Sequence, residues 1–468
     1  MEAQFLPTPN PTLPFWLTDR SPLDQIRSTP DLPSESDIVI IGAGYAGISL
    51  AYHLLTSAQK SGTAAVPSIT ILEARTVCSG ATGRNGGHVR PDTYSLIPRY
   101  MQRHGIDAAR EVAEFELSHI KALQDVIRAE KIEDCDFLLT RNVNVYLNQN
   151  RGNETKRAIE KLREMGCGFV DDIFVMDDKD AEAISGVKGA KTAFSFTAGS
   201  IWPYKFIMGL LHAVLRLGGD KVNIQTTTPV LSVSSTEGVH IVNTSRGTIR
   251  AKKVVYTTNA YTFGLVPEYA PSIIPAKGIV AHISVADGKR PPLLSQTYIL
   301  RPDASDGADY MIVRPDGSII IGGAHQIHTF PEKGAQGNAE WYGNIDDSSL
   351  IDSTREYWDG YMQRYFHGWE DTDAKVEKLW TGKVMGYSSD SAPHIGQIPS
   401  RPNQFIAAGF NGHGMPVIFL STKGLAEMIL HNTPYTQTGL PRIYKTSAER
   451  LEAARVGKEG GDILHFEQ

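Results

Sequence analysis

The uninterrupted apolar run at residues 38–41 predicts a buried β-strand, because strands covered on both faces read as continuous hydrophobic segments. A glycine follows at Gly42, and an apolar stretch with helical spacing begins close to Tyr45. A second apolar segment at 68–72 predicts another strand and ends at the acidic residue Glu73. This order of strand, helix and strand is typical of an α/β domain built on a parallel sheet.

The rest of the chain alternates between helical and strand patterns. Apolar spacing predicts helices over 108–127, 154–164, 204–214 and 350–366. Alternating or β-branched residues predict strands at 142–147, 230–233, 240–243, 248–251, 253–257, 296–300, 310–313 and 318–321. The mixed order indicates an α/β unit interleaved with a second unit that is richer in strands.

A glycine fingerprint joins the first predicted strand to its helix. Gly42, Gly44 and Gly47 have G-x-G-x-x-G spacing. Gly42 permits the tight turn, Gly44 lets the backbone approach a pyrophosphate, and Gly47 lets the helix pack closely on the strand. The free N–H groups and the positive dipole of the helix N-terminus favour phosphate at this point. Because Glu73 can accept hydrogen bonds from a ribose diol, the pattern predicts dinucleotide binding.

A glycine-rich loop follows Glu73. After Ala74 and Arg75, residues 79–88 read Ser-Gly-Ala-Thr-Gly-Arg-Asn-Gly-Gly-His. A nicotinamide enzyme would usually continue from the acidic residue into an ordinary crossover. A loop of this composition brings main-chain amides close to a second anionic or ring-bearing part of the cofactor. The alternative interpretation of the same glycines is a flexible loop in solvent.

These segments resemble the D-amino-acid-oxidase-like FAD-dependent oxidoreductases, and residues 79–87 are especially similar to gamma-glutamylputrescine oxidoreductases. The resemblance continues at 257–261 and 275–278, and in two C-terminal segments at 391–396 and 407–416. It runs from about residue 36 to about residue 430. It implies that the cofactor is FAD.

The implied fold is a Rossmann-like FAD-binding domain of the glutathione-reductase type with an interleaved substrate domain that contains an antiparallel sheet. A cofactor shared by two domains would lie at their interface. The expected parts are an irregular, proline-rich arm at 1–35 in which 14–16 pack on the body, an FAD-binding domain at 36–95, 198–264 and 378–432, a substrate domain at 96–197 and 265–377, and a C-terminal tail at 433–468.

The resemblance also implies the residues of the site. His413 lies in a Gly-Phe-Asn-Gly-His-Gly segment that implies proximity to the flavin, although a histidine in a structural turn would look the same. Arg90 could stabilise reduced flavin or simply pair with an acid, and His325 lies where relatives face the flavin. These three are the catalytic candidates. The predicted cofactor-binding residues are Gly42, Gly44, Tyr45, Ala46, Gly47, Glu73, Ala74, Arg75, Gly80, Ala81, Thr82, Gly83, Arg84, Asn85, Gly86, Gly87, His88, Val230, Thr258, Asn259, Ala260, Gly409, Asn411, Gly412, His413, Gly414 and Met415.

The implied activity is oxidation of a C–N bond in a small-molecule amine or amino-acid-like substrate. Hydride passes to FAD, and water hydrolyses the imine. Molecular oxygen is the expected acceptor, with hydrogen peroxide as product. Three alternatives share the fingerprint: a FAD-dependent dehydrogenase with another acceptor, a flavin monooxygenase, and a flavin-binding protein without amine oxidase activity. The segment 409–414 differs from the Gly-Asp-Ala type of motif expected late in a monooxygenase.

Two positions depart from sarcosine-oxidase-like relatives. Where those relatives attach flavin through a cysteine, this chain has Met385, whose thioether cannot form that bond, so noncovalent FAD is expected. Attachment through His88 or Cys78 stays an alternative. Where the relatives use a lysine to bind a substrate carboxylate, this chain has Pro416, which favours a larger amine or one bound by an arginine.

Several further residues are candidates for the substrate pocket. The arginines at strand ends are Arg301 and Arg314, which could equally be solvated. Aromatic residues at 202, 204, 298 and 310 could surround an amine, although aromatic residues in sheets more often belong to a core.

Composition narrows the partners and the compartment. The formal net charge of −6 at pH 7 over 468 residues argues against a nucleic-acid surface. Three cysteines are too few and too scattered for a disulfide framework or a zinc site, so reduced thiols and no metal site are expected. No secretory signal, membrane-spanning apolar run or peroxisomal C-terminal tripeptide is recognisable. We expect a cytoplasmic protein without a membrane partner, and its oligomeric state stays open.

Overall fold

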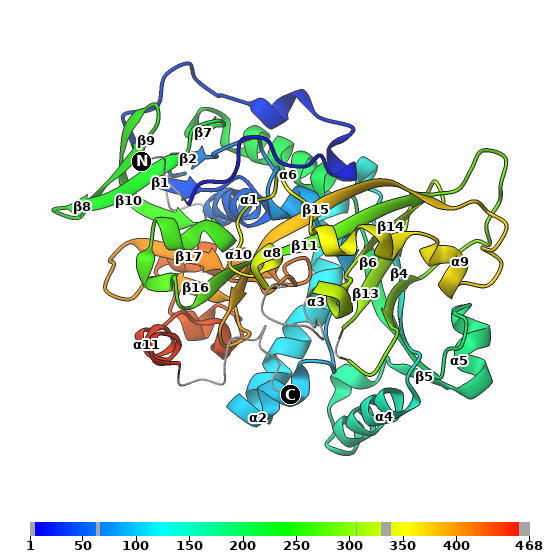
Figure 1. The fold of residues 1–468 in the computed structure, drawn as a ribbon. Helices are drawn as coiled ribbons and strands as arrows, with labels where there is room; N and C mark the ends of the chain where they lie inside the picture. Colours follow the sequence, from blue (N-terminus) through cyan, green and yellow to red (C-terminus); the bar gives the residue numbers. More distant parts are fainter. Residues whose placement is uncertain (1–4, 62–65, 306, 329–337, 458–468) are drawn as a thin grey trace.

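Two β-sheets, each flanked by helices, make up the molecule (Figure 1). The computed structural model describes residues 5–61, 66–305, 307–328 and 338–457. The first sheet is mainly parallel and the second mainly antiparallel, as the sequence predicts.

The first sheet contains the strand that precedes Gly42. Its path runs β16 (His394–Gln397), β17 (Gln404–Ala408), β10 (Gly247–Tyr256), β1 (Glu35–Ile41), β2 (Ile69–Leu72) and β7 (Val222–Gln225), with β9 (Val239–Thr244) paired to β10 and β8 (Val230–Thr236) paired to β9. The strands β17, β10, β1, β2 and β7 run parallel to one another. Their carboxyl ends therefore meet at one edge of the sheet, which is where ligands bind in open α/β sheets.

Three apolar helices pack together beside this sheet: α1 (Tyr45–Ser61), α6 (Pro203–Gly218) and α10 (Ile418–His431). Helix α1 lies between the other two, and Leu54 and Leu210 are fully buried in the shared core. Helices buried on most of their surface are apolar nearly all round, which is why α1 and α6 are recognisable from sequence.

The second sheet runs β15 (Lys375–Ser388), β11 (Ile273–Ser284), β14 (Ile319–Gly322), β13 (Asp309–Val313), β12 (Thr297–Arg301), β4 (Leu138–Tyr146), β6 (Thr192–Ser200) and β3 (His88–Val89), with β5 (Phe174–Asp177) beside β6. The pairs in it are antiparallel, except that β12 and β4 are parallel. The longest pair, β11 with β15, crosses the centre of the molecule in Figure 1.

The remaining helices are α2 (Ile97–His104), α3 (Ile106–Glu130), α4 (Gln149–Glu164), α5 (Asp178–Ser185), α7 (His325–His328), α8 (Asn338–Trp341), α9 (Tyr361–Tyr365) and α11 (Ala448–Val456). Helix α3 contacts α6 and α10, and its Val112 and Leu123 belong to the core that contains α1. A helix predicted for the substrate domain therefore packs against the first unit.

The predicted domain boundaries differ from sheet membership in three further places. Residues 198–200 were assigned to the FAD-binding domain, but they end β6 of the second sheet. β3 belongs to the second sheet although residues 36–95 were assigned to the FAD-binding domain. β15 pairs with β11 over nearly its whole length, so residues 378–388 belong to the second sheet as well. The predicted boundaries at 197/198 and 377/378 fall inside β6 and β15, where the strands continue without a break. The division into two functional domains itself stays a prediction.

The prediction of a single helix over 350–366 is wrong. A 3₁₀ segment at Asp352–Trp358 is separated from the short helix α9 by Gly360, whose φ of +64° ends the helical geometry. The two strands expected at 248–251 and 253–257 form the single strand β10. The other predicted helices and strands are confirmed, with shifted ends.

The N-terminal arm packs on the body, as predicted for 14–16. Trp16 is fully buried, and its indole N–H donates to the carbonyl oxygen of Asn85 at 2.5 Å. The arm approaches the second unit where the Thr12 N–H donates to the carbonyl of Asp347 at 2.8 Å. The C-terminal tail is attached as well, because Arg450 on α11 forms a bidentate pair with Asp390 at 2.6 and 2.8 Å.

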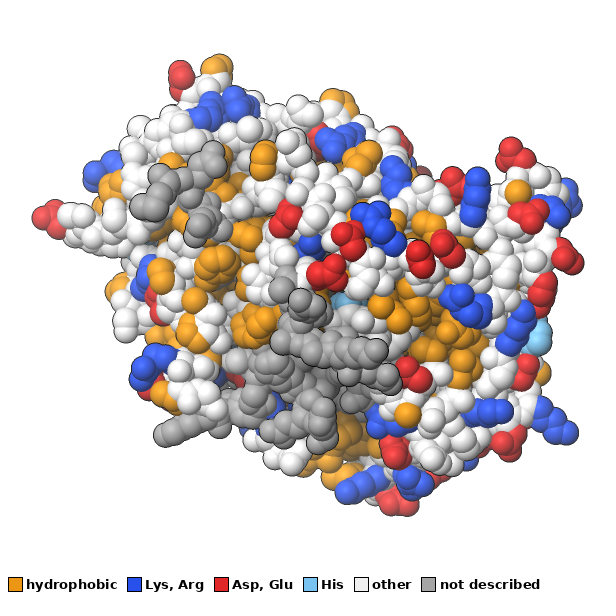
Figure 2. Space-filling model, in the orientation of Figure 1, with side chains coloured by type: hydrophobic (Ala, Val, Ile, Leu, Met, Phe, Trp, Pro, Cys, Tyr) orange, Lys and Arg blue, Asp and Glu red, His pale blue; other side chains and the backbone are white. Residues whose placement is uncertain are grey.

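Across the described residues, no helix combines the length and apolarity that a membrane crossing requires. Figure 2 shows acidic and basic side chains interspersed over the visible face rather than gathered by sign. The three cysteines, Cys78, Cys135 and Cys167, are buried and unpaired with one another.

Candidate active site

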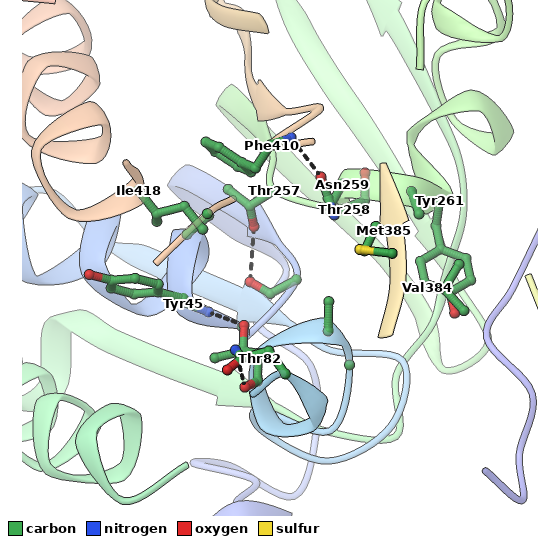
Figure 3. A pocket seen from close by; sticks show the side chains of 18 of the residues that line it. Tyr45, Thr82, Thr257, Thr258, Asn259, Tyr261, Val384, Met385, Phe410 and Ile418 are labelled. Atoms are coloured by element: carbon green, nitrogen blue, oxygen red, sulfur yellow. Dashed lines mark hydrogen bonds between the residues drawn. The ribbon is translucent and has the colours of Figure 1, made fainter. Parts of the chain in front are cut away.

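A cavity of about 300 Å³ lies at the carboxyl edge of the first sheet, within the size range of ligand pockets. Both sheets contribute to its wall (Figure 3). The N-terminal arm contributes as well. Most of the predicted cofactor residues line it: Gly42, Gly44, Tyr45, Ala46, Glu73, Ala74, Arg75, Gly80, Ala81, Thr82, Asn85, Gly86, His88, Val230, Thr258, Asn259, Ala260, Gly412, His413, Gly414 and Met415. The fold therefore brings together at one cavity predicted segments that lie hundreds of residues apart in the chain.

The three fingerprint glycines have different local surroundings. Gly42 has φ +109°, and a Cβ there would meet the Thr257 carbonyl oxygen at 2.9 Å. A Cβ on Gly47 would lie 1.9 Å from the Gly42 carbonyl oxygen, so Gly47 is fixed by helix–strand packing. A Cβ on Gly44 would meet only the Thr82 hydroxyl, at 3.1 Å. Of the three glycines, Gly44 is therefore the one at which the absence of a side chain opens space into the cavity rather than allowing close backbone packing.

The first turn of α1 faces the cavity. The Tyr45 N–H donates to the Thr82 hydroxyl at 3.0 Å, the contact drawn in Figure 3. Helix N-termini present unpaired N–H groups and a partial positive charge. The cradle therefore suits the diphosphate of a dinucleotide.

Glu73 is held in place at the end of β2. Its carboxylate accepts the Ala43 N–H and the Arg75 N–H, each at 2.9 Å. Two backbone bonds leave lone pairs on both oxygens, since each carboxylate oxygen accepts more than one hydrogen bond. The role of Glu73 as an acceptor for ribose hydroxyls stays a prediction.

Thr257 and Asn259 tie the end of β10 to its neighbours. The Thr257 hydroxyl donates to the Ile41 carbonyl at 2.8 Å, which fastens β10 to the fingerprint turn. The Asn259 side-chain oxygen accepts the N–H groups of Gly409 and Phe410 at 3.0 and 3.3 Å. These bonds hold the C-terminal segment against the cavity, and Figure 3 shows Phe410 and Asn259 in contact.

Met385 from β15 and Gly412 face one another across the wall. A Cβ on Gly412, which has φ +70°, would lie 3.0 Å from the Met385 sulfur and 2.7 Å from the Tyr387 hydroxyl. Met385 lines the cavity together with Val384 (Figure 3). The position predicted to lack a flavin-bonding cysteine is therefore at the site.

The glycine-rich loop supports the cavity through backbone and side chains. A Cβ on Gly86 would overlap the ring of Tyr310 at 2.1 Å, so Tyr310 packs directly on this glycine. The Asn85 amide donates to the Thr82 carbonyl at 2.8 Å and its oxygen accepts the Gly87 N–H at 2.7 Å. The loop is fixed by its own hydrogen bonds, which argues against the interpretation as a flexible loop.

Arg84 turns away from the cavity, contrary to prediction. Its guanidinium is fully buried and donates to the Thr381 and Thr12 carbonyls at 3.0 and 2.7 Å. Burial lowers the pKa of Arg84 to about 10, although Asp347 opposes that shift. The side chain fastens the arm and the second sheet to the loop.

Asp347 is the centre of this junction. Its carboxylate receives two hydrogen bonds from Arg75, at 3.1 and 2.9 Å, and one from the Thr8 hydroxyl at 2.6 Å. The residue is 1% exposed. Beside it, Phe5, Leu6 and Pro7 of the arm form part of the cavity wall.

At the other end of the cavity, His413 contacts a buried acid. Its Nε2 lies 2.7 Å from an oxygen of Glu116 on α3. The same Glu116 oxygen accepts the Asp92 N–H at 2.7 Å. Glu116 was not predicted as a site residue.

His88 and Arg90 follow the loop and also line this end. The His88 Nε2 lies 2.8 Å from the Thr297 hydroxyl. Enclosure in the wall, and then the charges of Arg90 and His413, lower the pKa of His88 well below its usual value. Arg90 lies 3.9 Å from Asp92 and stacks over Phe196 at 5.3 Å. Its pairing with an acid does occur, while its guanidinium still reaches the cavity wall.

Burial opposes ionisation of Asp92, but Arg90, His413 and the N–H groups of Ser95 and Leu96 together lower the pKa of Asp92. The carboxylate is therefore charged, and it partly balances the positive groups at this end of the cavity.

Some predicted residues lie outside the lining. Gly47 and Gly83 are packing positions, since a Cβ on Gly83 would lie 2.0 Å from the Cys78 carbonyl. Asn411 points to β15, where its oxygen accepts the Ser388 N–H at 2.6 Å. His325 lies on α7 with its ring 5.5 Å from that of His328. The predicted residues absent from the described lining are Gly47, Gly83, Arg84, Gly87, His325, Gly409 and Asn411.

The arginine and aromatic candidates mostly serve elsewhere. Arg314 is enclosed by Phe15, Trp16 and Trp202 and pairs with Asp136 at 3.0 Å. Trp202 packs on the arm, Tyr204 bonds Ser21 and Asp24, and Tyr298 packs on Phe366 in the second core. Of the four aromatic residues, Tyr310 alone is among the described residues that line the cavity.

Sequence reasoning missed several contributors, including Ile299 and Phe410 of the lining. Phe5 to Pro7 and Asp347 carry no motif. Glu116 did carry a signal, because a charged residue stands in the buried stripe of α3 between Val112 and Ile120. A charged side chain on the apolar face of a helix needs a partner, which here is His413.

The cavity offers hydrogen-bonding groups that fit FAD. Its first part offers a helix N-terminus, a side-chain-free approach at Gly44 and a carboxylate at Glu73. The apolar and aromatic residues Ile299, Tyr310 and Met385 line the same cavity, and they suit contact with a substrate that lies beside a flavin ring system. Oxidation and reduction at this site would be supplied by that ring system when bound.

Known proteins match nearly the whole chain. Residues 37–428 match the sequence family described as "DAO: FAD dependent oxidoreductase". The chain is 22% identical over 404 residues to "Gamma-glutamylputrescine oxidoreductase" of Escherichia coli K12, covering 84% of this chain and 83% of that protein. It is 23% identical over 422 residues to "Glycine oxidase" of Bacillus licheniformis, covering 89% and 98%.

Solved structures share the fold. Glycine oxidase from Geobacillus kaustophilus superposes with a TM-score of 0.63 at 17% identity, covering 86% of this chain and 96% of that chain. An L-amino acid deaminase from Proteus vulgaris superposes with a TM-score of 0.64 at 16% identity, covering 90% and 95%. The protein is an enzyme that belongs to the DAO family of FAD-dependent oxidoreductases.

Proposed function

We propose that the protein oxidises a C–N bond of an amine or amino-acid-like substrate to an imine, with molecular oxygen as the acceptor. FAD, when bound, accepts the hydride that leaves the carbon next to nitrogen. The first listed relatives and neighbours carry names that refer to amines or amino acids, which supports this substrate class.

The charge distribution of the cavity supports the proposal most directly. Glu73 is the sole carboxylate among the described residues that line it, and it lies at the fingerprint end. The other end presents His88, Arg90 and His413. Because this part of the described lining has no carboxylate and carries a positive group, it disfavours ammonium relative to the neutral amine. The neutral amine is the form from which hydride can leave.

The apolar lining would orient the substrate. Ile299, Tyr310 and Met385 line the same cavity. Tyr310 packs on Gly86 and is buried enough that its pKa is raised, so its hydroxyl stays neutral. We propose that this wall, formed largely by the second sheet, contacts the substrate, and that the first sheet holds FAD noncovalently.

The test is an anaerobic absorbance titration of the flavin-loaded protein with gamma-glutamylputrescine, glycine, L-proline and iminodiacetate. Bleaching of the flavin band, followed by recovery and hydrogen peroxide on admitting air, is the expected result. Bleaching without prompt recovery would assign a dehydrogenase with another acceptor. A flavin bleached by a reduced nicotinamide and by no amine would assign a monooxygenase. A flavin that none of these reduces would leave a flavin-binding protein.

A further inference from the structure

We propose that Glu116 and His413 form a carboxylate–imidazole pair that takes the proton from the substrate ammonium, with Glu116 as the positioning residue. This inference rests on the proposed amine oxidation and assigns the group that prepares the substrate for it.

The geometry places a buried acid behind an accessible imidazole. The side chain of Glu116 is 5% exposed, whereas that of His413 is 26% exposed and lines the cavity. The Glu116 oxygen lies 2.7 Å from the His413 Nε2 and accepts the Asp92 N–H at the same distance. The Asp92 N–H thus holds the Glu116 carboxylate independently of the imidazole.

The pair defines which ring nitrogen carries hydrogen. An ionised carboxylate only accepts hydrogen bonds, so the His413 Nε2 bears the proton and donates. The other nitrogen, Nδ1, is then an acceptor in the neutral ring. No other side-chain hydrogen bond of His413 occurs among the described residues. A carboxylate that fixes the tautomer of a catalytic imidazole is a recurrent arrangement in enzymes.

The neighbouring charged groups leave this role to His413. Arg90 cannot lose its proton, and Asp92 is occupied by the N–H groups of Ser95 and Leu96. His88 lines the cavity, but its Nε2 is engaged by Thr297, and its lowered pKa makes it a weak proton acceptor.

The groups behind the pair are engaged elsewhere. His119 on α3 contacts the Phe115 carbonyl at 2.8 Å and accepts the Leu420 N–H at 3.1 Å. Tyr100 donates to the Ser391 carbonyl at 2.8 Å, and Tyr444 is buried with a strongly raised pKa. Of the described titratable residues around this pair, His413 is therefore the one that combines access to the cavity with an available acceptor nitrogen.

The step is a simple proton transfer. An N–H bond of the substrate ammonium breaks, and an N–H bond forms at Nδ1 of His413. The products are a neutral amine with its lone pair and an imidazolium stabilised by the Glu116 carboxylate. No electrons change carrier in this step, and the proton leaves His413 to water at the cavity mouth.

The kinetic test compares Glu116→Gln and His413→Asn with the wild-type protein. The flavin is reduced anaerobically in rapid-mixing experiments across pH, with the amine from the panel above that bleaches the wild-type protein. We expect both variants to be about 100-fold slower near neutral pH, the lower end of a general base's usual contribution. The rates should converge with wild type near roughly pH 10, where an aliphatic amine arrives unprotonated.

A matched control is Glu114→Gln on the same helix. Glu114 is exposed, so its replacement removes one carboxylate from α3 without touching the cavity. Its pH–rate profile should match that of wild type. Equal slowing of the Glu116 and His413 variants at every pH would mean a purely structural pair and overturn the inference.

A second readout does not need a substrate. In ¹⁵N-histidine NMR of the flavin-loaded protein, the signal missing from His413→Asn identifies His413. We expect a protonated Nε2 and an unprotonated Nδ1 in mildly alkaline solution, and loss of that tautomer preference in Glu116→Gln. A protonated Nδ1 in the neutral ring would refute the proposed geometry. If the tautomer is as expected but no amine bleaches the wild-type flavin, the proposed function fails, and the proton-acceptor role fails with it.

Discussion

Replacing Asp347 by alanine should lower the free energy of unfolding by about 3–5 kcal/mol, the usual cost of removing one partner from a buried ion pair. Asp347 is 1% exposed and receives two hydrogen bonds from Arg75 at 3.1 and 2.9 Å. The buried Arg84 guanidinium lies 3.8 Å from it. The substitution would leave both guanidinium groups without their carboxylate, and desolvation of those charges dominates the loss.

The same substitution should also accelerate the release of flavin. Asp347 accepts the Thr8 hydroxyl at 2.6 Å and its carbonyl accepts the Thr12 N–H at 2.8 Å. Phe5 to Pro7, directly before Thr8, form part of the cavity wall. Loosening the arm therefore opens one side of the cofactor site as well as destabilising the fold.

The assay is urea unfolding of the flavin-loaded protein, monitored by tryptophan fluorescence and by flavin release. Asp352→Ala is the control, since the Asp352–Arg355 pair has side chains 70% and 56% exposed. An exposed pair contributes about 0–1 kcal/mol. The double variant with Arg75→Met should recover part of the loss, because it removes one unpaired guanidinium. If Asp347→Ala destabilises no more than Asp352→Ala, the reasoning from buried charge is refuted.

Three further predictions concern the fingerprint and the response to acid. Gly44→Ala should fold but bind flavin at least tenfold more weakly, a loss of about 1.4 kcal/mol. Gly47→Ala should fail to fold, because its Cβ would lie 1.9 Å from the Gly42 carbonyl oxygen. Circular dichroism and visible absorbance distinguish the two variants, and a Gly44→Ala protein with its full flavin content would contradict the cradle. Burial lowers the pKa of His53 and His394 to about 3 and the pKa of His119 to about 4. Because the unfolded chain takes up these protons at higher pH than the folded protein does, the free energy of unfolding should fall below about pH 6.5, by roughly 1.4 kcal/mol per pH unit for each histidine. Urea midpoints that stay constant between neutral pH and about pH 4 would argue against neutral buried imidazoles. Burial opposes ionisation of Asp390, but Arg450 lowers the pKa of Asp390 overall. The difference in unfolding free energy between wild type and Arg450→Met should therefore be largest above about pH 4 and should shrink as the pH falls further. An unchanged difference across that range would contradict the pairing.

The parts of the fold that were predictable depend on local rules. The strand before Gly42, the glycine spacing and the acid at Glu73 are fixed by backbone geometry within a short segment, so they are legible in the sequence. The prediction of one helix over 350–366 is wrong for a local reason too. Gly360 at φ +64° interrupts a pattern whose apolar spacing alone looked helical.

The unpredicted contacts join residues that are far apart in the chain. Asp347 meets Thr8 across 339 positions and Arg75 across 272. His413 meets Glu116 across 297 positions. Periodicity gives the face of a helix on which a residue lies, but not which distant polar group it will contact. Glu116 was identifiable as a buried acid in need of a partner, while the partner itself depended on how α3 packs beside α10.

The division of the cavity wall between the two sheets also indicates which part determines substrate specificity. The cradle with Gly44, Thr82 and Glu73 comes from the first sheet and its connections. The facing wall, with Ile299, Tyr310 and Met385, comes from strands of the second sheet. Because a family match transfers the cofactor more reliably than the substrate, variation of the second wall should change which amine reduces the flavin while leaving flavin retention intact. Tyr310→Phe is the most direct trial, since Tyr310 packs on Gly86 of the loop while its ring borders the cavity. A shift in the preferred amine with unchanged flavin content is expected, and a loss of flavin would instead place Tyr310 with the cofactor.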